Sequence, residues 1–286
     1  MNNVIEVNNL VKKYGNNTVI DNISFNVNKG EIFALLGANG AGKTTTLECI
    51  EKLRSYNDGT IQVNGSIGVQ LQSSSLPENI TVLEAFKLFS KWNNANEDLE
   101  LLNKLGFKDL LNKKYNTLST GQKRRLHLVL ALIGSPDIIF LDEPTAGVDV
   151  EGRITLHNEI RKLKENGKTI IIASHDMAEV EELCDRIAIL KNGKIAFLGT
   201  PIELTSVYLE QKVYIKTSGK IDIQDFKYSK YLDTKEEYYI FKTDTISDAL
   251  LELLTYLKEN NNKVLDLKIE RESLEHRFIQ IAKEEV

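Results

Sequence analysis

The sequence predicts an α/β fold with a mostly parallel sheet, followed by a small α+β domain. Three short stretches have the continuous apolar character of strands buried on both faces, and these are residues 31–36, 138–141 and 168–173. A helical pattern of apolar spacing follows each of them, over residues 44–53, 154–165 and 177–184. Strands that alternate with helices in this way favour a parallel sheet covered by helices.

The residues before the first buried strand alternate apolar and polar side chains, which is typical of strands with one solvent-facing side. Asn/Gly turns at residues 15–17 and 28–30 separate these short strands. A short strand pair is expected around residues 60–63 and 66–69. A closing hairpin is expected at residues 187–197, with its turn at Asn192-Gly193.

Two further regions complete the predicted architecture. The apolar spacing is helical between residues 81 and 111, and another helix is expected over residues 126–133, before Pro136. The pattern of predicted strands and helices then changes, which predicts a large domain over residues 1–210 and a small one over 211–286. The elements expected in the small domain are strands 213–216, 238–243 and 264–269 and helices 246–259 and 272–283.

The composition narrows the class of protein. The chain has 286 residues, 42% hydrophobic and 27% charged, with a net charge of 36 − 41 = −5. Because nucleic-acid binders usually carry a basic surplus, no nucleic-acid partner is expected. No apolar run approaches the ~20 residues of a membrane-spanning helix. Cys49 and Cys184 are predicted to be buried, reduced thiols, which fits a cytosolic setting.

A glycine-rich loop lies between the first buried strand and its helix, and it fits the pattern GxxxxGK[ST]. Glycines let backbone amides approach phosphate oxygens, and the helix N-terminus points further amides at the same anion. We expect Lys43 to reach the β- and γ-phosphates of ATP and the Thr44 hydroxyl to bind Mg²⁺. The residues predicted to bind the nucleotide here are Gly37, Ala38, Asn39, Gly40, Ala41, Gly42, Lys43, Thr44 and Thr45.

The second chemical feature is a pair of carboxylates at the end of a buried strand. Asp142 and Glu143 follow four apolar residues, at the strand end where open α/β sheets bind ligands. Asp142 is predicted to hold the Mg²⁺ shell. Glu143 is the candidate base that polarises the water attacking ATP.

Between these two features lies the segment Leu118-Ser119-Thr120-Gly121-Gln122, followed by a helix. With the phosphate loop and the Asp-Glu pair in this order, the chain resembles an ATP-binding cassette (ABC) ATPase, whose signature is LSGGQ. Ser119, Gly121 and Gln122 would then form a second anion cradle that closes on ATP held by another copy. In isolation the segment also fits an ordinary N-capped helix. Thr120 departs from the family pattern, which has glycine, and puts the tightness of dimer closure in doubt.

The resemblance implies roles for four more residues. Tyr14 matches the aromatic that stacks on adenine, and a surface tyrosine at a strand end is the alternative. Gln72 matches the glutamine that contacts Mg²⁺ and the attacking water, with Gln70 as second choice. Asp149 resembles the aspartate that crosses the dimer interface, and His175 the histidine that contacts the γ-phosphate. The other three histidines have no such placement.

The resemblance covers about residues 1–210. It implies a P-loop NTPase core with an antiparallel β subdomain and a helical subdomain, at about residues 73–133, that carries the signature. It further implies an ATPase with Mg²⁺ that works as a homodimer, or paired with a related ATPase subunit. Such a subunit would sit at the inner face of the cell membrane, bound to a separate transmembrane permease.

Residues 272–278 are similar to the ending of ATPase subunits in the drug- and antibiotic-exporting branch, or simply form an amphipathic helix. We therefore expect an ATPase that powers export of a drug, antibiotic or lipid-like substrate, whose identity the sequence does not give. An importer ATPase is the first alternative. A soluble ABC ATPase acting on DNA or ribosomes is less well supported, because the chain has neither a long coiled-coil insertion nor a second cassette.

Overall fold

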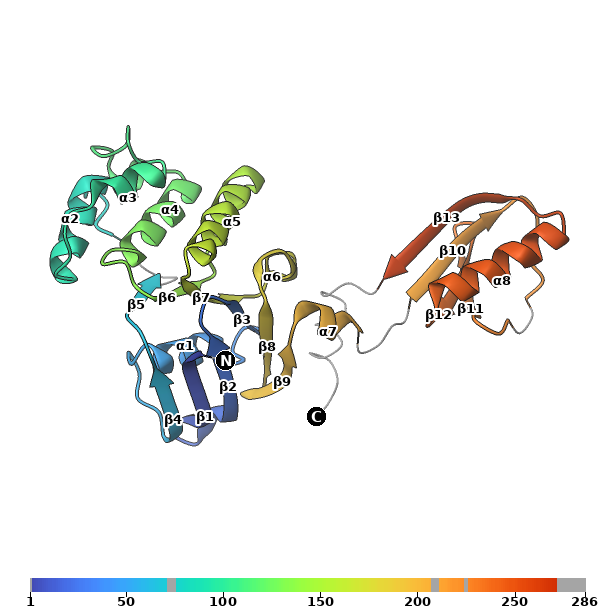
Figure 1. The fold of residues 1–286 in the computed structure, drawn as a ribbon, viewed down its shortest axis with the longest axis horizontal. Helices are drawn as coiled ribbons and strands as arrows, with labels where there is room; N and C mark the ends of the chain where they lie inside the picture. Colours follow the sequence, from blue (N-terminus) through green and yellow to red (C-terminus); the bar gives the residue numbers. More distant parts are fainter. Residues whose placement is uncertain (1, 71–75, 207–210, 224–225, 272–286) are drawn as a thin grey trace. The chain divides into compact units, whose positions relative to one another are not determined.

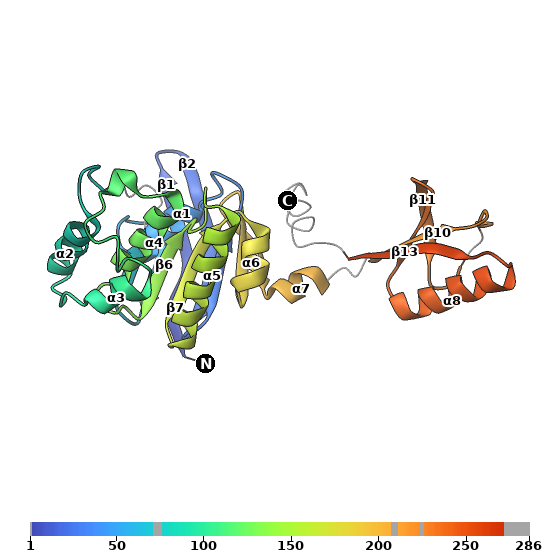
Figure 2. The ribbon, with the colours of Figure 1, turned by 90° about the horizontal axis from the view of Figure 1, so that it is seen from above.

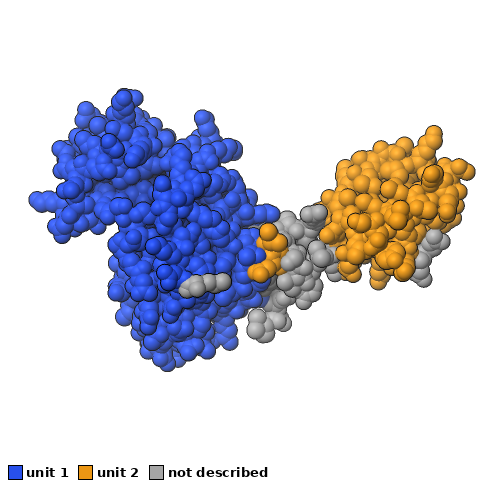
Figure 3. Space-filling model, viewed as in Figure 1, with its two compact units in different colours: residues 1–201 blue, residues 202–286 orange. Residues whose placement is uncertain are grey.

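The computed structural model describes residues 2–70, 76–206, 211–223 and 226–271. The chain divides into two compact units, residues 1–201 and 202–286 (Figure 3). The predicted domain boundary, between residues 210 and 211, lies a little further along the chain. Each unit has a hydrophobic core of its own.

A six-stranded sheet forms the centre of the first unit (Figure 1). Its strands, in spatial order, are β5 (Ile67–Gln70), β6 (Ile138–Asp142), β7 (Thr169–Ser174), β3 (Ile32–Leu36), β8 (Arg186–Lys191) and β9 (Lys194–Gly199). The first five are parallel, and β9 pairs antiparallel with β8. The predicted hairpin turn is confirmed, because Asn192 and Gly193 both have positive φ, at 49° and 77°.

A three-stranded antiparallel sheet lies beside this central sheet. It contains β1 (Asn3–Tyr14), β2 (Asn17–Asn28) and β4 (Asp58–Val63) in the order β2-β1-β4. Helix α1 (Lys43–Ile50) contacts both β2 and β7, and its apolar side chains join those of the two sheets in one core. This core fixes α1, and with it the loop that precedes α1, against the strand ends of the central sheet.

Helices cover the opposite face of the central sheet (Figure 2). Helix α4 packs on β5, and α5 and α6 pack on β7. The helices of this region are α2 (Val82–Trp92), α3 (Leu99–Lys104), the 3-10 turn η1 (Tyr115–Thr117), α4 (Thr120–Ala131), α5 (Val150–Glu165) and α6 (Met177–Leu183). The stretch predicted as helical over 81–111 holds α2 and α3, and α2 begins with a capping box between Thr81 and Glu84.

The strand pair expected around residues 60–63 and 66–69 is wrong as a pair. Strands β4 and β5 form there, but β4 pairs with β1 and β5 pairs with β6. Gly65, with a φ of 140°, lies in the short connection that carries the chain from one sheet to the other. Residues close in sequence therefore belong to two different layers.

In its described residues, the second unit holds a four-stranded antiparallel sheet with helix α8 (Ile246–Glu259) packed on it. Its strands are β10 (Gln211–Thr217), β11 (Lys230–Lys235), β12 (Tyr238–Thr243) and β13 (Val264–Arg271), in the order β11-β12-β10-β13. Helix α8 buries Leu253 and Leu257 against Val213, Ile215 and Phe241. The unit also holds most of the short helix α7 (Pro201–Ser206), and the predicted helix over 272–283 lies outside the described residues.

The structure also bears on membrane-spanning helices and on the two cysteines. Within the described ranges, no helix is both long enough and apolar enough to span a membrane. Cys49 and Cys184 are buried and free, as predicted.

Candidate functional site

The glycine-rich loop joins the end of β3 to the start of α1. The Lys43 ammonium donates to the carbonyl oxygens of Gly37, at 2.8 Å, and Ala38, at 3.3 Å, so this side chain curls back over the loop. Gly42, the residue before α1, has a φ of 104°, and a Cβ there would lie 2.9 Å from the Val19 carbonyl oxygen. Only glycine both adopts this positive φ without strain and leaves room for the Val19 carbonyl.

A pocket of about 190 Å³ opens beside this loop. Its polar wall combines the loop with the two carboxylates predicted from the strand end, Asp142 and Glu143. Val19 at the start of β2 also lines it, a residue that the sequence analysis missed because a lone valine in a strand carries no chemical signal. The complete lining is Val19, Asn39, Gly40, Gly42, Lys43, Thr44, Thr45, Asp142 and Glu143.

Asp142 and Thr44 form a set of oxygen donors at this pocket. The Thr44 hydroxyl lies 3.3 Å from the Asp142 carboxylate, and hydroxyl and carboxylate oxygens are ligands that Mg²⁺ prefers. Burial raises the pKa of Asp142, which the hydrogen bond from Thr44 partly offsets. Burial likewise lowers the pKa of Lys43, against the opposing effect of Glu143 and Asp142. These residues fit a magnesium ion with its nucleotide phosphates.

Glu143 and His175 come from neighbouring parallel strands and meet at the same edge of the sheet. Nδ1 of His175 lies 2.8 Å from Oε1 of Glu143. The Glu143 backbone has a φ of 49°, an uncommon value outside glycine, and its amide donates to the Ala173 carbonyl at 2.9 Å. The Glu143 side chain is 15% exposed and that of His175 60%, so the pair faces solvent from the histidine side.

The signature segment begins helix α4 and carries a capping box. The Ser119 hydroxyl accepts from the Gln122 amide at 3.2 Å, while the Ser119 amide donates to the Gln122 side chain at 3.0 Å. The N-capped helix considered as an alternative is therefore present. Ser119 is exposed. The next residue, Thr120, packs toward Gly147: a Cβ added to this glycine would lie 3.7 Å from Cγ2 of Thr120. Asp149 lies at the start of α5 and caps this helix by accepting a hydrogen bond from the Gly152 backbone amide at 2.9 Å.

Within the part of the chain that the structure describes, the predicted site residues that do not line the pocket are Tyr14, Gly37, Ala38, Ala41, Ser119, Gly121, Gln122, Asp149 and His175. Tyr14 ends β1 and is 42% exposed, with Lys12 Nζ 4.8 Å and Arg54 Cζ 5.5 Å from its ring centroid. Gln72 lies outside the described residues. Gln70, the second choice, is 2% exposed at the end of β5, and neither of its side-chain polar atoms has a hydrogen-bond partner among the described residues.

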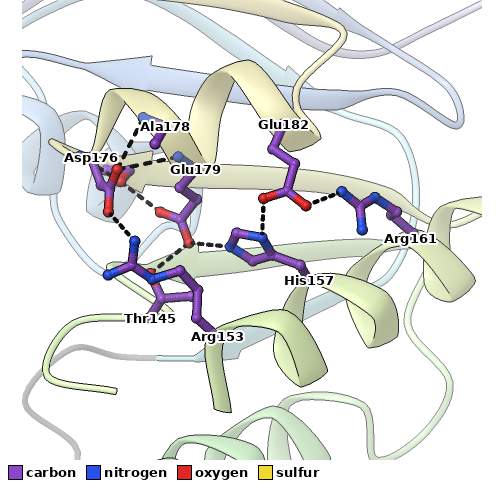
Figure 4. A network of polar contacts seen from close by, with 9 residues as sticks. Thr145, Arg153, His157, Arg161, Asp176, Ala178, Glu179 and Glu182 are labelled. Carbon is purple, nitrogen blue, oxygen red and sulfur yellow. Dashed lines mark hydrogen bonds and ion pairs between the residues drawn. The ribbon is translucent and has the colours of Figure 1, made fainter. Parts of the chain in front are cut away.

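A buried polar network behind the pocket was not anticipated from the sequence (Figure 4). It joins Thr145, which follows Glu143 closely, to Glu179 on α6 and His157 on α5. His157 carries no motif and its sequence neighbours are those of an ordinary amphipathic helix. Only the packing of α5 and α6 on β7 brings these side chains together.

An α/β core with a phosphate loop, a carboxylate-bearing strand end and a signature segment defines the class of ATP-binding cassette ATPases. The family described as ABC transporter matches residues 20–146. An uncharacterised ABC transporter ATP-binding protein of Methanocaldococcus jannaschii is 40% identical over 202 residues, covering 68% of this chain and 77% of that protein. This chain therefore belongs to the family of ABC transporter ATP-binding proteins, the subunits that bind and hydrolyse ATP.

Other relatives and solved structures agree. The linearmycin resistance ATP-binding protein LnrL of Bacillus subtilis is 35% identical, covering 71% of each chain. The Nod factor export ATP-binding protein I of Burkholderia orbicola is 38% identical, covering 69% of this chain and 71% of that protein. A solved structure of an ATP-binding subunit of an ABC transporter is 27% identical with a TM-score of 0.64, covering 70% of this chain and 91% of that one. The predicted fold class is confirmed.

Proposed function

We propose that this ATPase subunit powers export through a separate membrane permease, which places it at the inner face of the membrane. Relatives named for linearmycin resistance and for Nod factor export support the direction. The transported compound is selected by the permease and is left open. Import is the alternative direction of transport, and cell assays distinguish it from export.

Within the site, Glu143 is proposed as the base that polarises the attacking water and His175 as the group that contacts the γ-phosphate. The observation that carries this proposal is their 2.8 Å contact at the edge of the phosphate-loop pocket. Lys43 neutralises phosphate charge, while Thr44 and Asp142 hold Mg²⁺. Gln72 is proposed to contact the same ion.

The site is proposed to be completed by the signature of a second copy, or of a related ATPase subunit. Among the described residues, nothing from 119–122 lines the pocket, whereas Ser119 is exposed and free to face another molecule. Val150, directly after Asp149, and Ile154, four residues further along α5, are 74% and 55% exposed. Apolar side chains at this spacing support a surface that another subunit covers.

The chemistry is tested with Glu143→Gln. We expect ATP affinity within about threefold of the wild type and turnover at least about 100-fold lower, because the base is gone. ATP with Mg²⁺ should then trap a dimer that size-exclusion chromatography detects. Glu165→Gln, an exposed acid at the C-terminal end of α5, is the matched control and should retain turnover. Normal turnover in Glu143→Gln would remove Glu143 from its assigned role.

The transport role is tested by purification from membranes and by cell assays. Recovery with a multi-span membrane protein supports the proposal, whereas recovery with nucleic acid or ribosomes overturns it. Cells carrying Glu143→Gln should accumulate more of an exported antibiotic than wild-type cells. Lower uptake of a nutrient, with antibiotic levels unchanged, would instead assign the subunit to an importer.

A further inference from the structure

Glu179 places a carboxylate in the interior of the first unit, with 1% of the residue exposed. Its Oε1 accepts from the Thr145 hydroxyl at 2.8 Å, and its Oε2 accepts from the Ser174 hydroxyl at 2.7 Å (Figure 4). A carboxylate this buried is stable only when its oxygens are hydrogen-bonded or paired with a cation. Both oxygens are used, each by a different segment of the chain.

These two segments are the ones that carry Glu143 and His175. Thr145 follows Glu143 by two residues, and Ser174 directly precedes His175. The Ser174 hydroxyl also accepts from the Asp176 amide at 3.0 Å, which fixes the backbone on the far side of His175. One side chain on α6 therefore holds both strand ends at which the proposed hydrolytic pair meets.

Helix α6 is itself anchored close to Glu179. The Asp176 carboxylate caps the helix by accepting from the Ala178 and Glu179 amides, at 3.0 and 3.2 Å. Arg153 on α5 lies 3.2 Å from the same carboxylate. The Glu179 backbone is thus fixed relative to α5, so the position of its carboxylate is set by packing as well as by the two hydroxyls.

His157 lies behind Glu179. Its Nε2 lies 3.6 Å from Glu179 Oε1, an ion-pair distance rather than a hydrogen bond, and its Nδ1 lies 2.8 Å from Glu182 Oε2. Burial lowers the pKa of His157, but the two carboxylates outweigh it and the pKa is raised above the ordinary value. Arg161 pairs with Glu182 on its outer side.

We propose that Glu179 is a positioning residue for ATP hydrolysis: by binding Thr145 and Ser174 it holds Glu143 and His175 in contact. The inference rests on the roles proposed above for Glu143 and His175. Glu179 does not line the pocket, so its effect on the reaction runs through the two strand ends.

The test compares Glu179→Gln with Glu182→Gln. An amide offers one acceptor oxygen in place of two, so one of the two hydroxyl groups loses its acceptor or must accept a hydrogen bond instead of donating one. We expect kcat at least about tenfold lower in Glu179→Gln, with KM and Kd for ATP within about twofold. Glu182→Gln is the matched control on the same helix, because Glu182 contacts His157 but neither Thr145 nor Ser174, and its kcat should stay within about twofold.

A second pair of variants keeps the test valid if Glu179→Gln fails to fold. Thr145→Val removes the hydroxyl at similar size and should lower kcat at unchanged Kd, whereas Thr145→Ser keeps it and should restore kcat. Wild-type kcat in Glu179→Gln and Thr145→Val would overturn the inference, as would an equal loss in Glu182→Gln. If Glu143→Gln also retained turnover, the failure would lie in the proposed function instead.

Discussion

His175 and Glu143 are joined by a 2.8 Å contact although they lie 32 residues apart in the chain. The contact exists because β6 and β7 are neighbours in the sheet, with Asp142 opposite Ala173 in their register. The residues that follow the two strands consequently emerge side by side. The imidazole is the more exposed partner, so it can reach a phosphate while Glu143 stays near the buried Asp142.

This contact leads to the first prediction, for His175→Ala. We expect turnover at least about 100-fold lower with ATP affinity retained, because the phosphate loop is untouched while the group proposed to contact the γ-phosphate is lost. His175→Gln should keep more activity than the alanine variant, since an amide can still donate to phosphate. Steady-state ATPase assays and equilibrium nucleotide titration measure the two quantities. Full turnover in His175→Ala would remove this residue from the reaction.

The second prediction concerns the phosphate loop. Gly42→Ala adds a Cβ about 2.9 Å from the Val19 carbonyl at a φ of 104°, so we expect ATP affinity at least about tenfold lower. Gly30→Ala is the control, because Gly30 also has a positive φ, 77°, but has open space around it and lies away from the pocket. Nucleotide titration should show normal affinity in Gly30→Ala. Equal losses in both variants would point to general destabilisation.

The third prediction separates the metal from the nucleotide. Asp142→Asn should raise the Mg²⁺ concentration for half-maximal hydrolysis at least about tenfold, because a charged oxygen ligand becomes neutral. ATP binding without Mg²⁺ should stay close to normal. Asp137→Asn is the control at the other end of the same strand, where the carboxylate binds Ser66. An unchanged Mg²⁺ dependence in Asp142→Asn would contradict the assignment.

Much of the fold was predictable from local patterns. Strand β12 and helix α8 have the predicted bounds, since both show the apolar periodicity of a half-buried element. Strand β11 was missed because it lies at the sheet edge and buries little beyond Tyr231, so its sequence lacks apolar alternation. The separation of β4 from β5 was missed because partner choice depends on distant strands, which no local pattern specifies.

The candidate site likewise divides into residues that local motifs predict and residues that only packing brings together. Residues in motifs, such as Lys43 and Asp142, were predicted because phosphate and metal binding require particular residue types at particular spacings. Glu179 and His157 were not, because a hydrogen-bonded network can use any polar residues that packing brings together. Tyr14 was predicted from resemblance alone, and its described contacts are with two cations rather than with the pocket.

The fourth prediction addresses Thr120, where the family signature has glycine. In a Glu143→Gln background, Thr120→Gly should form the ATP-trapped dimer at an ATP concentration about threefold to tenfold lower, because the side chain no longer narrows the approach of the second copy. Size-exclusion chromatography across an ATP series measures the midpoint. An unchanged or higher midpoint would show that the threonine, packed toward Gly147, does not hinder closure.

The last prediction concerns Glu51, at the C-terminal end of α1. Burial, with the nearby charges of Asp142 and Glu48, raises its pKa from 4.5 to about 7, and one of its carboxylate oxygens is buried with no hydrogen-bond partner in the described part of the chain. The folded state therefore binds a proton that the unfolded chain has released between these two pH values. The contribution of Glu51 to the free energy of unfolding must fall as pH rises from about 4.5 to 7, and stay low above it.

Glu51→Gln should remove this dependence. We expect the variant to be about 1 to 3 kcal/mol more stable than the wild type at pH 8, since each pKa unit corresponds to about 1.4 kcal/mol, and nearly equal to it at about pH 4.5. Urea unfolding without nucleotide or Mg²⁺, at several pH values, measures the difference. The fluorescence of Trp92, the chain's one tryptophan, follows the unit that contains Glu51. A stability difference that does not change with pH would assign the effect to packing rather than to the charge of Glu51.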